Sequence, residues 1–316
     1  MASSDAYLSV QIPTDTAKTA VQPRAKSERG LYWWLAPALI LYGVFKIGPI
    51  LAGLVIATLR WDGVEPPIFV GLQNFERMGM DNRLIPALLN NAQYALGTVI
   101  GKLILSLVLA LLLHQGLRGR AFYRTALFMP VVMSFVVVSV LWGFLYNDQF
   151  GLINNFFRAV GLDMLAQNWL GDVRIALHSL MVVDIWKWYG FHMVIFLAGL
   201  QSIPTELYEA ARVDGASRWA QFWKITLPLL RPVMVINITT SLLGAFNVFE
   251  IPYIMTEGGP ANSTNVISLH AYTQAFEFYR FGYGAALNYA IFVLVTVIAL
   301  VQLRLTLSER NAEMDI

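Results

Sequence analysis

Six long apolar runs constrain this chain more than any other feature. An α-helix needs about 20 mostly apolar residues to cross a bilayer, and six segments of that kind follow one another along the sequence. Charged residues make up 13% of the chain and hydrophobic residues 57%, whereas about 25% of a soluble domain is charged. We therefore expect an all-α, polytopic membrane protein with six transmembrane helices. The expected spans are residues 31–59, 91–115, 125–146, 173–200, 232–254 and 284–307.

The distribution of basic residues predicts the orientation of these spans. With six spans, both termini lie on the same side of the membrane. Most of the 22 Lys and Arg residues fall in the tails and loops of that side, whereas the acidic residues are divided evenly. Because cytoplasmic loops are enriched in Lys and Arg, we expect a multi-pass protein of the cytoplasmic (inner) membrane with both termini in the cytoplasm. Residues 1–30 and 308–316 are expected to form cytoplasmic tails around a transmembrane domain over 31–307.

Several classes of function find no support in the sequence. The chain has no cysteine, which excludes disulfides and thiolate chemistry, and its four histidines are too scattered for a metal site. The nearest match to a phosphate-binding loop, residues 97–102, has too few residues between its glycines and lies in an apolar run. Gly97 and Gly101 fit better as small residues at a close helix contact. We expect no catalysis, bound cofactor, metal or nucleic-acid partner.

The longest loop expected on the cytoplasmic side, residues 201–231, has the pattern of two short helices. The first is expected to end at Gly215, because glycine adopts the positive φ of a helix end. The second, over 216–226, is amphipathic and is expected to end at Pro228. The pattern alone predicts a helical hairpin at the membrane surface. The apolar face of the second helix carries Trp219, Phe222 and Trp223.

The same loop contains a spaced motif: Glu-Ala-Ala, three residues, Gly, nine residues, Ile, one residue, and Leu-Pro. In this spacing it resembles the EAA loop of permease subunits from binding-protein-dependent ABC importers. A second segment, residues 256–264, is similar to the Thr-x-Gly-Gly-Pro segment of the maltose-type sugar permeases. The resemblance covers residues 31–307 and implies the type I ABC importer permease fold of the maltose type. The motif and its neighbours are Glu209, Ala210, Ala211, Asp214, Gly215, Ile225, Leu227 and Pro228.

The resemblance also implies partners. The helix that contains Glu209 would dock into a groove on a cytoplasmic ATPase, and a carboxylate beside small side chains suits that task. The complete importer would contain a second, related permease and two ATPase subunits, which use ATP and Mg²⁺. An extracytoplasmic binding protein would deliver the sugar substrate. The chain itself would be a transport subunit surrounded by membrane lipid, without a cofactor of its own.

Acidic residues lie inside two of the expected spans, where charge is costly and marks candidate sites. Asp184 and Lys187 are three residues apart and can form an ion pair on one helix face. The aromatic residues around them either pack or stack on a sugar. Asn247 and Glu250 are placed similarly on the fifth span, which Pro252 is expected to kink.

In the family, these two spans line a sugar site in the middle of the membrane. Ala245 and Val248 stand where the maltose permease has polar groups, and Lys187 introduces a charge. Maltose is therefore in doubt, and an oligosaccharide or a glycoside fits better. A glycerol phosphate or another small polar solute is an alternative. The expected substrate-binding residues are Trp186, Lys187, Trp188, Phe191, Ser241, Gly244, Ala245, Asn247, Val248 and Glu250.

An ion-coupled secondary transporter is the alternative from a different class, with Asp184 or Glu250 as its proton or sodium site. A passive channel is a further alternative. The motif in the cytoplasmic loop argues against the secondary transporter, because such a carrier needs no ATPase dock. No role follows from the sequence for Lys46 or Lys102.

Overall fold

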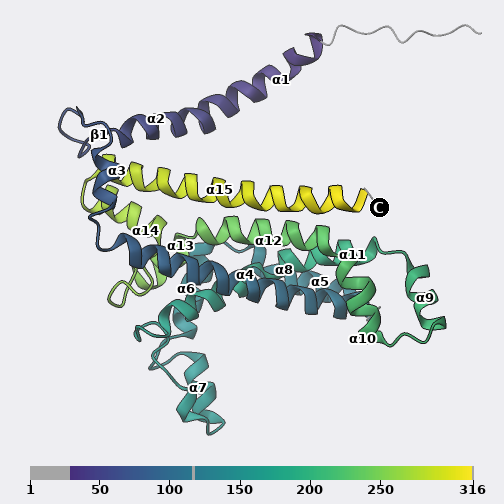
Figure 1. The fold of residues 1–316 in the computed structure, drawn as a ribbon. Helices are drawn as coiled ribbons and strands as arrows, with labels where there is room; N and C mark the ends of the chain where they lie inside the picture. The colour runs from purple at the N-terminus through teal and green to yellow at the C-terminus, as the bar shows by residue number, and fades with distance from the viewer. Residues whose placement is uncertain (1–28, 116–117, 315–316) are drawn as a thin grey trace, which may run out of the picture. The chain divides into compact units, whose positions relative to one another are not determined.

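The computed structural model describes residues 29–115 and 118–314, and most of them are helical (Figure 1). Most of the tail expected over 1–30 lies outside the described residues. The chain divides into two units, Met1–Ile50 and Leu51–Ile316. The described part of the first unit is a helical run, which consists of α1 (Arg29–Tyr42), the π-helical η1 (Gly43–Ile47) and the start of α2 (Gly48–Ala57).

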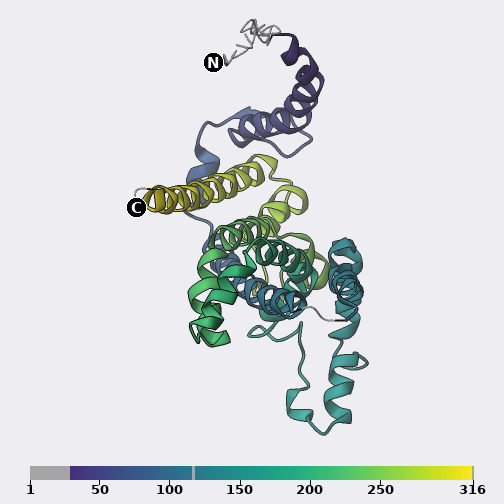
Figure 2. The same ribbon diagram turned by 90° about the vertical axis from the view of Figure 1, so that its right-hand side faces the viewer.

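Long helices lie side by side in the second unit (Figures 1 and 2). The pair with the most extensive contact consists of α4 (Leu84–His114) and α8 (Ala176–Gln201). Helix α12 (Arg231–Phe246) packs against both, α5 (Arg120–Val132) packs against α8, and α15 (Phe281–Met314) packs against α12. Helix α15 extends through most of the segment that was expected to be a C-terminal tail.

Within the described residues, four helices are long and apolar enough to cross a membrane: Trp34–Ala57, Leu84–His114, Ala176–Gln201 and Phe281–Gln302. Two further pairs of helices qualify together but are bent. Helices α5 and α6 (Phe135–Leu145) meet at 98°, and the run Arg218–Leu229 meets α12 at 65°. With each bent pair counted as one span, the number of candidate spans is six, and the predicted fold class is confirmed.

The third expected span, 125–146, is not one straight helix, because α5 ends at Val132 and α6 begins at Phe135. Ser134 has an extended backbone and accepts a hydrogen bond from the Val137 N–H at 3.3 Å. This is the geometry of a helix N-cap, so a new helix starts there in a new direction.

The fifth expected span, 232–254, is also interrupted, but not at Pro252. Helix α12 ends at Phe246, and α13 (Glu250–Thr256) begins after a break at residues 247–249. Pro252 lies in the first turn of α13, where a missing N–H leaves no helical hydrogen bond unmade. Broken backbone at membrane depth occurs where it is buried in protein or lines a water-filled cavity.

The loop over 201–231 forms two helical arms, as expected. The first is α9 (Thr205–Val213), and the second is built from α10 (Arg218–Gln221), the π-helical η3 (Phe222–Thr226) and α11 (Leu227–Leu229). The second arm ends at Leu229, one residue beyond the predicted end at Leu227-Pro228. The wide π-turn shifts the hydrogen bonding, so that the Leu227 N–H bonds to the Phe222 carbonyl and the helix continues past Pro228.

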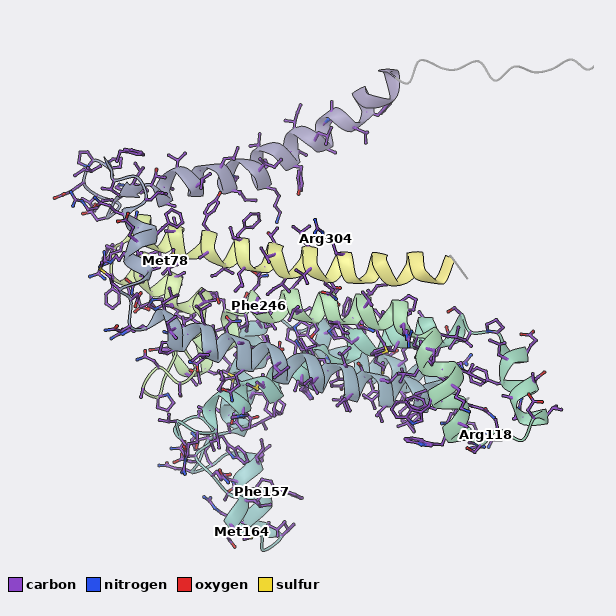
Figure 3. All side chains as sticks on the ribbon, in the orientation of Figure 1. Met78, Arg118, Phe157, Met164, Phe246 and Arg304 are labelled. Atoms are coloured by element: carbon purple, nitrogen blue, oxygen red, sulfur yellow. The ribbon has the colours of Figure 1, made fainter. Side chains whose placement is uncertain are left out.

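Short elements connect the helices. A two-stranded antiparallel ribbon pairs β1 (Leu59–Arg60) with β2 (Ile68–Phe69), with Leu59 opposite Phe69, and it is a small addition to the all-α prediction. The segment around α7 extends away from the other helices of the second unit, with Phe157 and Met164 near its far end (Figure 3). The remaining short elements are α3 (Gln73–Met78), α7 (Leu152–Ala159), η2 (Asp163–Leu165), α14 (Ile267–Tyr272) and η4 (Thr273–Glu277).

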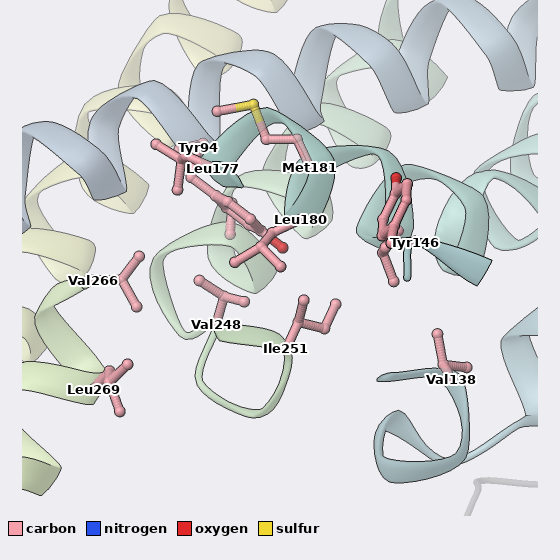
Figure 4. Packing of buried hydrophobic residues seen from close by; sticks show 13 residues of the cluster. Tyr94, Val138, Tyr146, Leu177, Leu180, Met181, Val248, Ile251, Val266 and Leu269 are labelled. Carbon is pink, nitrogen blue, oxygen red and sulfur yellow. The ribbon is translucent and has the colours of Figure 1, made fainter. Parts of the chain in front are cut away.

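The largest buried cluster gathers around α8 (Figure 4). Leu180 of α8 is fully buried and packs with Tyr94 of α4 and Ile251 of α13. The approach of α4 to α8 requires small residues, because a Cβ atom at Gly97 or Gly101 would collide with side chains of α8. This geometry confirms the prediction that the two glycines mark a close helix contact.

A polar link joins distant segments at the end of the second unit where α4 begins. The Asp81 carboxylate lies just before α4 and accepts hydrogen bonds from His270 Nε2 at 2.8 Å and the Tyr283 hydroxyl at 2.6 Å. His270 and Tyr283 are buried. Burial alone would raise the pKa of Asp81, but the hydrogen bonds from Tyr283 and His270 outweigh it and lower the pKa below its usual value.

Candidate functional site

A cavity of about 400 Å³ lies between α4, α8, α12 and the break that precedes α13. Lys102, which lines it, is about 27 Å from the Leu84 end of α4 and about 18 Å from the His114 end, at 1.5 Å per residue. The cavity is therefore near the middle of a long apolar helix. It is lined by Lys102, Phe135, Asp184, Trp188, Phe191, His192, Thr240, Ser241, Gly244, Asn247, Val248 and Glu250.

Most of the residues predicted to bind substrate line this cavity. They are Trp188, Phe191, Ser241, Gly244, Asn247, Val248 and Glu250. Three others do not: Trp186, Lys187 and Ala245. Trp186 is two positions, or about 200° of helical rotation, from Trp188, and it packs edge-on against Trp142 at a ring distance of 5.6 Å. Ala245 is buried in the same cluster.

Other lining residues were absent from the sequence prediction of the pocket: Lys102, Phe135, Asp184, His192 and Thr240. Helical periodicity could have identified two of them, because Asp184, Trp188 and His192 are spaced four residues apart and share one face of α8. Lys102 was visible as a charge at membrane depth without a partner. Phe135 reaches the cavity only because α6 starts in a new direction, and no sequence pattern indicated that bend.

The ion pair at the cavity joins two helices instead of lying within one. Lys102 Nζ of α4 is 2.5 Å from Asp184 Oδ2 of α8, and both side chains are buried. The expected pair between Asp184 and Lys187 is wrong, although the two residues are three positions apart. Lys102 was left without a role by the sequence and is the actual partner. A charge at this depth requires such pairing, because its desolvation is costly.

Lys187 has a different set of partners, at the bend between α5 and α6. Its ammonium donates hydrogen bonds to the carbonyls of Met133 at 2.6 Å, Val131 at 3.3 Å and Pro130 at 3.5 Å. It also lies 4.7 Å from the centre of the Phe135 ring. These carbonyls lie at and just beyond the end of α5, where helical carbonyls lose their partners; Pro130 alone among the three also accepts the Met133 N–H at 3.3 Å. Lys187 therefore caps the bend from α8 and does not reach the cavity.

Polar contacts fix two further regions. His192 Nδ1, in the cavity wall, lies 2.8 Å from Asn237 Oδ1 and links α8 to α12. At the end of α13, the Thr256 and Thr264 hydroxyls lie 2.7 Å apart, and Thr264 also donates to the Gly259 carbonyl at 2.7 Å. The segment that resembles the sugar permeases is thus a closed turn, with Thr264 fully buried.

The first arm of the 201–231 loop differs from every long helix of the second unit, because none of its residues is buried. Glu209 and Arg212 form an exposed pair at 3.8 Å, and Ala210 is also exposed. The chain then turns back at Gly215, whose φ is +77°. The Tyr208 hydroxyl lies 3.0 Å from the Thr226 hydroxyl and ties the first arm to the second.

The remaining motif residues of the loop lie on the second arm. Ile225, Leu227 and Pro228 are partly buried, whereas Asp214 is exposed beside Gly215. The motif therefore divides into an exposed part on and just after α9 and a packed part on η3 and α11. Trp219, Phe222 and Trp223 gather on the second arm with ring distances of 5.4–5.9 Å, as expected.

Comparison with known proteins identifies the family. Residues 102–310 match the family described as "Binding-protein-dependent transport system inner membrane component". The chain belongs to this family. The permease is 35% identical over 275 residues to the lactose transport system permease protein LacF of Rhizobium radiobacter, which covers 85% of this chain and 92% of the relative. It is 34% identical over 277 residues to the trehalose/maltose transport system permease protein MalF of Thermococcus litoralis, with 86% and 92% covered.

The fold of the permease also has a solved counterpart. It superimposes with a TM-score of 0.77 on a chain of a bacterial ABC transporter involved in the import of the acidic polysaccharide alginate. The sequence identity is 25%, and the match covers 88% of this chain and 95% of the other. The permease is therefore an inner membrane transport subunit with the predicted type I importer fold, and not an enzyme.

Proposed function

We propose that this permease forms part of the path by which an ATP-driven importer moves a sugar, either an oligosaccharide or a glycoside, into the cytoplasm. The observation that carries the proposal is the 400 Å³ cavity near the middle of α4. Trp188 and Phe191 offer aromatic faces to the apolar side of a sugar ring, and Ser241 and Asn247 offer hydrogen-bonding groups. The sugars named for the two relatives, lactose and trehalose/maltose, support the same class of substrate.

The exposed helix α9 is proposed to dock on a cytoplasmic ATPase. A helix with an apolar flank and no buried residue gains stability when a partner covers it. Its packed second arm would transmit the motion to α12, which lines the cavity. Two copies of the ATPase, a second related permease and an extracytoplasmic binding protein would complete the importer, and ATP and Mg²⁺ would be used by the ATPase alone.

The proposed orientation has both termini in the cytoplasm, together with the ends of the helices near α9. Arg118 lies at the same end of the second unit as α9 and α10 (Figures 1 and 3), so basic connections gather there. The chain has no native cysteine, which allows a direct test. Ser217→Cys should react with impermeant thiol reagents only from the cytoplasm, and Met164→Cys only from outside. The reverse pattern would contradict both the orientation and the ATPase dock.

The alternative of an ion-coupled carrier with Asp184 or Glu250 as the ion site is not favoured. Asp184 is already paired with Lys102, which leaves Glu250 as the only one of the two expected ion sites without a partner among the described residues. A carrier of that kind would also have no use for α9 as an exposed dock. The sugar and ATPase proposals therefore account for more of the described chain.

The cavity proposal is tested by two tryptophans of one helix. In the reconstituted importer, Trp188→Ala should lower uptake of the sugar carried by the cognate binding protein about five- to thirtyfold per assembled complex, because truncation removes about 1–2 kcal/mol of stacking. Trp186→Ala is the matched control: it should lower the yield of assembled complex and leave uptake per complex nearly unchanged. Normal uptake by Trp188→Ala would contradict the cavity role.

A further inference from the structure

We infer that the cavity selects neutral, hydroxyl-rich solutes and rejects anionic ones such as uronates and phosphorylated sugars. This inference rests on the proposed transport function and narrows its substrate class. It is carried by the charged groups of the cavity wall and by the hydrogen-bonding groups that the wall leaves for a ligand.

The charged groups of the cavity wall add up to a net negative charge. Three charged side chains line the cavity: Lys102, Asp184 and Glu250. The single ammonium among them is already held by Asp184 at 2.5 Å. Glu250 lies at the start of α13, and among the described residues no hydrogen bond or ion pair reaches its carboxylate. A solute therefore meets a net negative wall with an unpaired carboxylate.

Other basic groups near the cavity do not reverse this balance. The Lys187 ammonium is turned toward the end of α5, where three carbonyls accept its hydrogen bonds. The Phe135 ring, which lines the cavity, lies 4.7 Å from that ammonium. His192 is hydrogen-bonded through Nδ1 to the Asn237 side-chain oxygen, so a neutral ring presents only an acceptor at Nε2.

The polar groups of the wall offer a ligand both acceptors and donors. The Asn247 side chain donates one N–H to a backbone carbonyl at 2.8 Å, which leaves its oxygen and its second N–H for a ligand. The Thr240 hydroxyl donates to a backbone carbonyl at 2.9 Å. The Ser241 hydroxyl has no partner among the described residues. A ligand that both donates and accepts hydrogen bonds therefore fits this wall.

A neutral sugar or polyol meets this requirement, since each hydroxyl can both donate and accept a hydrogen bond. A carboxylate or phosphate can only accept, and it would also face the Glu250 carboxylate, which no ion pair neutralises among the described residues. The permease should differ in this respect from the structurally similar transporter, which is involved in importing an acidic polysaccharide.

The experiment measures the charge of the cavity without knowledge of the sugar. A single cysteine at Gly244 would face the cavity, because a Cβ atom there meets nothing within 4 Å. The purified complete importer is treated in detergent with a cationic reagent, trimethylammonioethyl methanethiosulfonate, and with an anionic one, sulfonatoethyl methanethiosulfonate. The rate of modification is followed by the mass of this subunit, and the cation-to-anion rate ratio is divided by the same ratio for 2-mercaptoethanol.

We expect the normalised ratio to exceed one by on the order of tenfold, since nearby negative charge favours one reagent and opposes the other. Adding Glu250→Gln to Gly244→Cys should lower it on the order of tenfold. The matched control, Glu65→Gln, neutralises an exposed carboxylate of the β1–β2 loop and should leave the ratio unchanged. A ratio of one or less, no response to Glu250→Gln, or no reaction with either reagent would overturn the inference.

This outcome is separable from the fate of the proposed function. If sugar uptake failed while the cationic reagent kept its advantage, the cavity would be acidic but its role in sugar transport would be wrong. If a neutral sugar were taken up while the normalised cation-to-anion rate ratio was one or less, the proposed transport function would be supported and the inference of charge selection would be wrong.

Discussion

Charged side chains differ in burial between the region around α8 and the surface of α9. Around α8, Lys102, Asp184 and Lys187 are buried, and the partners of each belong to another helix of the same chain. Along α9, the Glu209–Arg212 pair is exposed and no residue of the helix is buried. The transmembrane region therefore satisfies its polar groups internally, as a bilayer demands. The loop over 201–231 instead leaves the surface of α9 exposed.

The largest effect is expected where the internal pairing is broken. Lys102→Met leaves the Asp184 carboxylate buried without a partner, which costs about 3–5 kcal/mol. We expect the yield of folded complex to fall sharply, as measured by size-exclusion chromatography of the purified importer. The double variant Lys102→Met with Asp184→Leu removes both charges and should recover much of that yield. No recovery would mean that the pair does more than neutralise its own charges.

A smaller loss of stability is expected when the Lys187 contacts at the α5–α6 bend are removed. Lys187→Met leaves the Val131 and Met133 carbonyls without a donor, and each unsatisfied group costs about 1–3 kcal/mol. Spin labels at Thr125→Cys and Leu141→Cys report the bend angle through their distance distribution, which should shift or broaden in the variant. The exposed Lys224→Met serves as control. An unchanged distribution would show that packing alone sets the 98° bend.

The next effect in size is expected from a charge reversal on the exposed helix α9. Glu209→Lys reverses the charge of an exposed residue on a helix with no buried residue, so the fold should persist. The amount of ATPase that co-purifies with the permease should fall about tenfold, which corresponds to 1.4 kcal/mol of docking energy. Glu65→Lys, a charge reversal outside the loop, should have no effect. If the Glu209→Lys permease retained the ATPase in full, the proposed docking role of α9 would be wrong.

The smallest effect is expected at the polar link before α4. Because the pKa of Asp81 is lowered in the folded chain, its carboxylate stabilises the fold above the unfolded value of about 3.9 and ceases to do so as the pH falls through the lower folded value. Asp81→Asn should lower the thermal stability modestly at neutral pH. The difference from the unaltered protein should shrink at about pH 3.5. Asp163→Asn, at an exposed carboxylate, is the control, and a pH-independent difference would contradict the link.

Sequence alone determined the features that depend on local pattern. Apolar length predicted the helical membrane fold, and small residues at Gly97 and Gly101 predicted the close contact of α4 with α8. The positive φ at Gly215 followed from the Asp-Gly break, and the spacing of the loop motif led to the permease family. These signals are local because they depend on hydrophobic length, on backbone preference and on residue spacing along one segment.

Only the tertiary structure decided which side chains meet. Sequence spacing favoured Asp184 with Lys187, but the direction of α8 turns Lys187 toward the end of α5 and leaves Asp184 to Lys102 from α4. The break at residues 247–249 is equally non-local, since it is tolerated at that depth because a cavity adjoins it. A buried charge must find whatever partner the packing brings within reach, and packing between helices distant in sequence leaves no periodic trace in either one.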